Sequence, residues 1–133
     1  MYDVIHAAST IGRKDGSFAF SLIEFQPNSE VFLTKLKEVI QKVNQTTGLN
    51  LNEEAHRHDV IQFSSLPWRR FTGLTHASRF GQEDSVPKIS FGKVFKRGEK
   101  HFLPISVDVH HGFMDGWHIA QYLTKLEEEL RRC

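Results

Sequence analysis

The run His110-His111-Gly112-Phe113-Met114-Asp115-Gly116 holds the side chains best suited to acid–base chemistry in this chain. The segment before it alternates in polarity. Its apolar positions are Leu103, Ile105, Val107 and Val109, and the positions between them are Phe102, Pro104, Ser106 and Asp108. If the alternation continues, His111 lies on the apolar side at the end of a strand and His110 points the other way. A neutral imidazole beside an apolar surface has a pKa near or below neutrality, which suits a general base.

The first half of the chain predicts a hairpin followed by a helix. Strands are expected over Val4–Thr10 and Ser17–Phe25, joined by a turn at Gly12–Gly16. Ser29 is the predicted N-cap of the helix, which carries apolar residues at a spacing of 3.6. Gly48 is expected to end it.

The second half predicts further strands. Short strands are expected at Val60–Phe63 and within Phe71–His76. Lys88–Phe95 and His101–His110 are expected to form one hairpin, closed by the turn residues Lys96 to Glu99. No repeat or linker interrupts the sequence, so residues 1–133 are interpreted as a single domain.

The C-terminal segment predicts a helix that begins after Asp115, a normal N-cap residue. Its apolar stripe consists of Ile119, Leu123, Leu126 and Leu130. Such a stripe needs a sheet to bury against. Together the elements predict an α+β fold, a mixed or antiparallel sheet with helices on one side.

Composition excludes several function classes. The formal net charge of +1 argues against a nucleic-acid partner bound by phosphate neutralisation. No apolar run approaches the ~20 residues of a membrane span, and no signal-peptide pattern opens the chain. The single cysteine, Cys133, forms no internal disulfide, which fits a reducing cytoplasm.

The histidine run and its flanks resemble the chloramphenicol acetyltransferase family. The flanking matches are Leu103–Val109, Trp117–Ala120, Ser65–Trp68 followed by Phe71, and Pro87 followed by Ile89–Lys93. The resemblance extends from about Val4 to Leu130 and is strongest after Ser64. The short motif by itself also occurs in peptide-synthetase condensation domains. A His-Arg form of it occurs in dihydrolipoamide acyltransferases.

The resemblance implies a coenzyme A-dependent acyltransferase fold, a two-layer sandwich, and an O-acetyltransferase activity. Acetyl-CoA is then the cosubstrate, no metal is needed, and the acceptor is the hydroxyl of chloramphenicol or a similar small molecule. His111 matches the family's general base. No acyl-enzyme is required, so Cys133 need not be a nucleophile. The family also implies a cytoplasmic homotrimer with sites at subunit interfaces and a role in antibiotic resistance, with no membrane partner.

Further site residues follow from the same resemblance. Asp115 and Gly116 match positions that support the site structurally. Ser90 matches a hydroxyl that helps to hold the intermediate through water, and Lys93 matches a lysine near the coenzyme A phosphates. The family's oxyanion serine is replaced by Gly73. Thr72 is therefore a candidate substitute, although a regular strand would turn it to the opposite face.

The resemblance also implies that the chain starts partway through the family's fold and corresponds to its C-terminal part. The family's front segment supplies an arginine that pairs with the motif aspartate, and no residue here can be assigned to it. The chain is therefore expected to self-associate. Two alternatives stay open, a truncated or degenerate non-catalytic member and an acyltransferase with another acceptor.

A metal site is an alternative interpretation of the histidine residues. His56 and His58 with Asp59 could ligate a metal, as could His110-His111 with Asp115. Adjacent residues on a strand point to opposite faces, which disfavours the second set. The sequence therefore predicts no metal.

Overall fold

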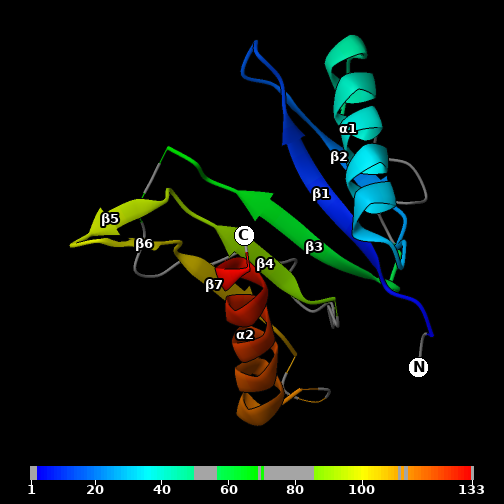
Figure 1. The fold of residues 1–133 in the computed structure, drawn as a ribbon. Helices are drawn as coiled ribbons and strands as arrows, with labels where there is room; N and C mark the ends of the chain where they lie inside the picture. Colours follow the sequence, from blue (N-terminus) through cyan, green and yellow to red (C-terminus); the bar gives the residue numbers. More distant parts are fainter. Residues whose placement is uncertain are drawn as a thin grey trace.

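A computed structural model describes residues 3–49, 57–68, 70, 86–110, 112 and 114–132. In chain order the elements are β1 (His6–Gly12), β2 (Phe18–Ile23), α1 (Ser29–Gln45), β3 (Val60–Ser65), β4 (Lys88–Phe91), β5 (Phe95–Arg97), β6 (Lys100–Phe102), β7 (Ile105–Asp108) and α2 (Gly116–Arg131) (Figure 1). The predicted strand within Phe71–His76 falls outside the described residues.

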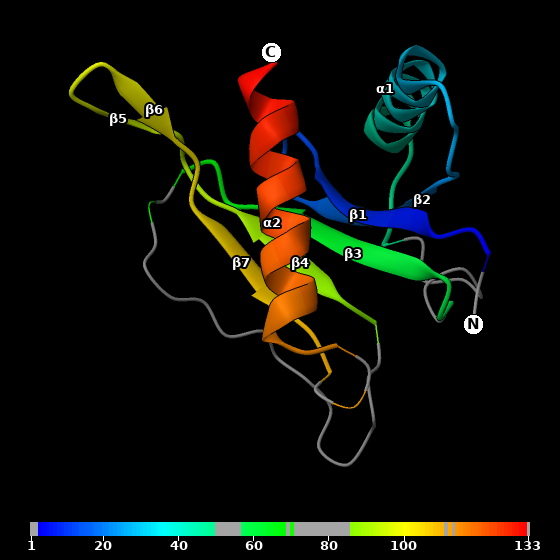
Figure 2. The same cartoon turned by 60° about the horizontal axis from the view of Figure 1, so that its bottom comes forward.

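The main sheet has the strand order β2-β1-β3-β4-β7. The two outer pairs, β1 with β2 and β4 with β7, are antiparallel, whereas β3 runs parallel to both β1 and β4. In both views α1 lies along β2 and α2 lies along β4 and β7, so the helices form one layer on the sheet (Figures 1 and 2). The predicted α+β architecture with a mixed sheet is confirmed.

The first hairpin turns where the sequence predicts. The Arg13 N–H donates to the Ser17 carbonyl (2.8 Å), and Gly16 takes a left-handed φ of +87°. The Asp15 carboxylate accepts from the Ser17 N–H and from its hydroxyl (2.9 and 2.6 Å). This side-chain pairing fixes the turn, and β1 and β2 leave it in antiparallel register.

Helix α1 begins one residue earlier than predicted, because Asn28 and not Ser29 is its N-cap. The Asn28 backbone is extended, and its side-chain oxygen accepts from the N–H groups of Glu30 and Val31 (2.9 and 3.3 Å). The helix ends at Gln45, where Thr46 is extended. Gly48 (φ +88°) therefore follows the helix end.

The core beneath α1 lies at the turn end of the first hairpin, where Ile11 pairs with Ala19. Val43 is buried against Ile11 and Ala19, with Val39 packed beside them. The Arg13 guanidinium donates to the Val43 carbonyl (2.7 Å) and so ties the end of the helix to the turn. Val43 is the one buried residue of α1.

The second predicted hairpin is divided into two parts, which corrects the expectation of continuous strands. β4 pairs with β7 in the main sheet, whereas β5 and β6 form a separate ribbon around Gly98 (φ +64°) (Figure 2). Pro104 lies between β6 and β7 and has no N–H to donate to a ladder. Its carbonyl accepts from the Gly92 N–H (2.9 Å), where the two parts meet.

The apolar stripe of α2 is only partly covered. Ile119 and Leu126 are half-buried, Leu123 and Leu130 are exposed, and no described residue of α2 is buried. The helix is amphipathic as expected. Among the described residues, however, no element covers its apolar side fully.

Candidate active site

The structure describes four of the six predicted site residues. Ser90 lies in β4, Lys93 follows that strand, Asp115 precedes α2, and Gly116 opens the helix. His111 and Thr72, like Gly73, lie outside the described residues. The described neighbours of the histidine run define the surroundings of the candidate site.

The strand that leads to the histidines is shorter than predicted. β7 ends at Asp108, which pairs with Lys88, the first residue of β4. The residue before Lys88 is Pro87, which has no N–H for a further ladder bond. The strand, and with it the alternation of side chains between its two faces, therefore ends before the histidine run. The orientation expected for His111 does not follow from strand geometry. Residues 103–110 are all half-buried, so alternating polarity does not become alternating burial here.

His110 is held by the loop that follows it. Its Nδ1 accepts from the Gly112 N–H (3.1 Å), which places the proton of the neutral ring on Nε2. The His110 carbonyl accepts from the Met114 N–H (3.2 Å). A Cβ on Gly112 would lie 3.0 Å from Nδ1, so a glycine allows this close approach.

Asp115 is the N-cap of α2, as the sequence predicts. Its carboxylate accepts from the backbone N–H groups of Trp117 and His118 (both 3.1 Å). The His118 Nδ1 is 2.7 Å from the same oxygen. A carboxylate has no proton to give, so His118 Nδ1 is the donor in this contact. The 3.5 Å separation between His118 Nδ1 and the Asp115 N–H is then not a hydrogen bond.

These contacts set the charge at the start of α2. The hydrogen bond from the His118 N–H, followed by the contact with its imidazole, lowers the pKa of Asp115 below its ordinary value. The carboxylate stays ionised at the positive end of the helix dipole. Sequence reasoning missed His118 in this role. Its position, three residues after an N-cap, is the one from which side chains commonly reach back.

Gly116 has no steric requirement in the described structure. A Cβ there meets nothing within 4 Å, and its φ is not left-handed. A close approach that favours glycine therefore exists at Gly112 and not at Gly116.

Ser90 is fully buried in the middle of the sheet. Its hydroxyl oxygen is 2.7 Å from that of Ser64 on the neighbouring strand β3. Lys93 is exposed, three residues further along the chain. The two residues thus offer a buried hydroxyl and an exposed ammonium group close together in sequence.

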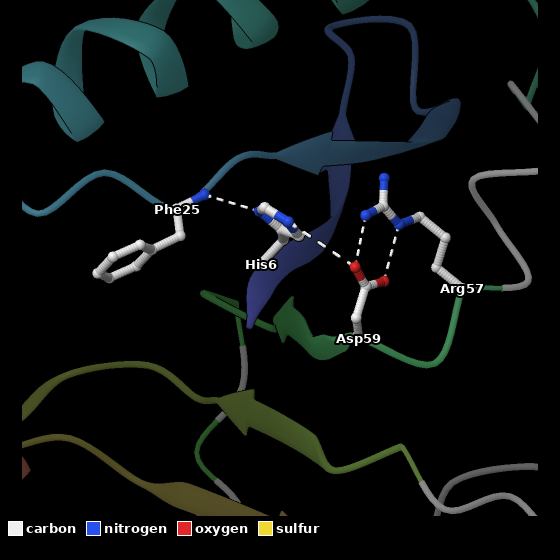
Figure 3. A network of polar contacts seen from close by, with 4 residues as sticks. All are labelled: His6, Phe25, Arg57 and Asp59. Carbon is white, nitrogen blue, oxygen red and sulfur yellow. Dashed lines mark hydrogen bonds and ion pairs between the residues drawn. The ribbon is translucent and has the colours of Figure 1, made fainter. Parts of the chain in front are cut away.

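A second polar cluster joins β1, the β2–α1 connection and the start of β3 (Figure 3). The His6 Nδ1 accepts from the Phe25 N–H (2.9 Å), and its Nε2 faces the Asp59 carboxylate at 3.8 Å. Arg57 donates to both oxygens of Asp59. That pairing lowers the pKa of Asp59 to about 2. The contacts of this cluster link β1, the β2–α1 connection and the segment just before β3, which are distant in sequence.

The described residues give no support to the alternative metal site. Asp59 is engaged by Arg57, and Asp115 by His118. Within the described ranges, no three or more His, Cys, Asp or Glu side chains lie where they could hold a metal ion. In the same part of the chain, no helix has the length and apolar character needed to cross a membrane.

Solved structures show the same fold. A chloramphenicol acetyltransferase superposes with a TM-score of 0.85 at 24% identity, over 96% of this chain and 62% of that one. The dihydrolipoamide acetyltransferase of Azotobacter vinelandii superposes with a TM-score of 0.63 at 18% identity, over 96% and 54%. At these identities the likeness concerns the fold.

Sequence comparison gives the family. The chain is 25% identical to a chloramphenicol acetyltransferase of Campylobacter coli over 98% of this chain and 60% of that protein. It is 37% identical to one of Clostridium butyricum over 96% and 58%. The chain thus spans about 60% of the length of these curated relatives. The family model described as chloramphenicol acetyltransferase matches residues 1–127. Since that match covers nearly the whole sequence, the chain belongs to the chloramphenicol acetyltransferase family.

Proposed function

We propose that the protein transfers an acetyl group from acetyl-CoA to a hydroxyl of chloramphenicol or a similar small molecule. The observation that carries the proposal is the family match over residues 1–127, which includes the whole histidine run. The N-cap contacts of Asp115, near the end of that run, support an ordered start of α2 beside the proposed site.

In the proposed reaction His111 is the general base. Its neutral imidazole takes the proton of the acceptor hydroxyl while that oxygen forms a bond to the thioester carbonyl carbon. The carbon–sulfur bond then breaks, and the coenzyme A thiolate leaves and takes the proton back from His111. The acetyl group passes directly to the acceptor, so no nucleophilic side chain is consumed.

The other proposed roles follow the chemistry of each group. The Ser90 hydroxyl supports the negative oxygen of the tetrahedral intermediate through water, with Thr72 as a further candidate donor. Lys93 provides an exposed ammonium, which fits a phosphate of coenzyme A. Asp115 positions the loop and the helix start through its cap contacts. No step requires a metal.

The proposed working unit is a homotrimer with sites between subunits, located in the cytoplasm, where a chloramphenicol-modifying enzyme confers resistance. The exposed apolar residues Leu123 and Leu130 on α2 are compatible with a covering subunit. The single cysteine fits a reducing compartment.

A second candidate is a non-catalytic family member, or an acyltransferase with another acceptor. Gly73 favours the non-catalytic candidate, because a glycine stands where the family has its oxyanion serine and so supplies no side-chain donor at that position.

The test is acetyl transfer by the purified chain. Thiol release from acetyl-CoA is followed with and without chloramphenicol, and the product is identified by mass. Acceptor-dependent thiol release with acetylated chloramphenicol supports the proposal. Transfer to other alcohols alone indicates a different acceptor. If no acceptor increases the rate of thiol release, the result favours the non-catalytic alternative.

A further inference from the structure

The His6 side chain joins two segments through the two nitrogens of its ring (Figure 3). Nδ1 accepts from the Phe25 N–H of the β2–α1 connection at 2.9 Å, and Nε2 lies 3.8 Å from the Asp59 carboxylate just before β3. A backbone N–H can only donate, so Nδ1 carries no proton in this arrangement. The contact with Phe25 therefore exists only while the imidazole is neutral, with its one ring proton on Nε2.

The Asp59 side of the ring is fixed whatever the charge of His6. The His6 N–H donates to the Asp59 carbonyl (2.9 Å), and His6 pairs with Val60 in the parallel ladder of β1 and β3. Arg57 donates to both oxygens of the Asp59 carboxylate. Because this pairing lowers the pKa of Asp59 to about 2, the carboxylate stays ionised throughout the range in which histidines change charge. A protonated His6 therefore keeps Asp59 as a partner.

The Phe25 side of the ring responds to protonation in the opposite way. A second ring proton sits on Nδ1 and faces the Phe25 N–H, so two donors meet and the hydrogen bond is lost. Among the described residues, the charged groups on the sheet side of the ring are Asp59 and, bound to it, Arg57. On the other side, Glu24 precedes Phe25, and its carboxylate lies 3.6 Å from Lys35 Nζ of α1. The charge that favours a protonated ring thus comes from Asp59, away from Phe25.

We propose that His6 is a pH-sensitive switch on the β2–α1 connection: the neutral ring holds the Phe25 backbone, and the protonated ring releases it while remaining against Asp59. The His6 side chain is 19% exposed, so protons reach it from solvent. Residues 24–28 form the released connection, which ends at Asn28, the N-cap of α1. Acidification therefore loosens the entry to that helix. The switch is independent of the proposed acetyl transfer.

Amide hydrogen exchange of the full chain, measured by NMR at about pH 8 and about pH 5, tests the switch. Rates are expressed as protection factors, which remove the intrinsic effect of pH on exchange. The protection factor of the Phe25 amide should fall by about threefold to tenfold at the lower pH, the range for one lost hydrogen bond. The Phe20 N–H is the matched control, because it donates to the Leu49 carbonyl (3.0 Å), a group that does not titrate. The protection factor of Phe20 should stay the same.

Two variants separate the acceptor of His6 from its charge. His6→Asn puts an amide oxygen near the position of Nδ1 and does not titrate, so the Phe25 protection factor should stay high at both pH values. His6→Phe keeps a ring without an acceptor, so the Phe25 protection factor should be low at both. An equal wild-type Phe25 protection factor at the two pH values, a fall shared by Phe20, or a fall that persists in His6→Asn overturns the inference. The wild-type comparison needs no variant, so it decides the question even where a variant does not fold.

Discussion

Ile89 is the buried side chain next to Ser90 on β4, and its truncation should measure how strongly the centre of the sheet is held. Ile89 is 3% exposed and pairs with Phe63 on one side and Val107 on the other. Ile89→Ala removes three buried carbons, worth ~0.8 kcal/mol each. The cavity left behind adds roughly 1–2 kcal/mol. The expected loss in the free energy of unfolding is therefore about 3–4 kcal/mol, and Ile89→Val should lose about 1 kcal/mol.

The assay is urea unfolding followed by far-UV circular dichroism. Leu33→Ala is the control, because it also removes three carbons, but from a helix position that is 51% exposed. It should cost less than about 1 kcal/mol, since part of the transfer term and the whole cavity term are absent. Equal losses for Ile89→Ala and Leu33→Ala, or an Ile89→Ala loss below about 1 kcal/mol, would refute the burial argument.

Three further outcomes are expected. Asn28→Ala should lower the free energy of unfolding by ~1 kcal/mol through the lost cap, whereas Ser29→Ala, which removes no cap contact, should be nearly neutral in the same urea titration. The pKa of Asp59 is lowered from 3.8 to about 2, so its contribution to stability is present above about pH 4 and is lost as the pH falls toward 2. Asp59→Asn should therefore flatten the dependence of Tm on pH in that window, and a slope equal to wild type would contradict this. Gly112→Ala should displace the His110 ring, because the added Cβ lies 3.0 Å from Nδ1, and unchanged His110 imidazole resonances in NMR would contradict the close approach.

Local chemistry was predictable where neighbouring residues decide the structure. The hairpin around Gly16 and the cap at Asp115 both follow from side chains within a few positions of each other. The N-cap of α1 was misplaced by one residue because Asn28 and Ser29 are both good caps, and only the backbone geometry distinguishes them.

Features that depend on long-range pairing were not predictable. The Ser64–Ser90 contact needs the register of two strands joined by a long connection, and no local pattern reports that register. The end of β7 depends on Pro87 in the paired strand, which stops the ladder beside Asp108. The burial of α2 likewise depends on what covers it, whereas its amphipathic pattern states only which side is apolar.

The central claim is that His111 acts as the general base, and comparing His111→Ala with His110→Ala tests it most directly. Both variants are assayed for acetylation of chloramphenicol, with melting curves to establish folding. A positioned base typically contributes ~10²–10⁴-fold to the reaction rate. We therefore expect His111→Ala to lower kcat by ~10²-fold or more and His110→Ala to lower it far less. Equal losses in the two variants, or full activity in His111→Ala, would contradict the account.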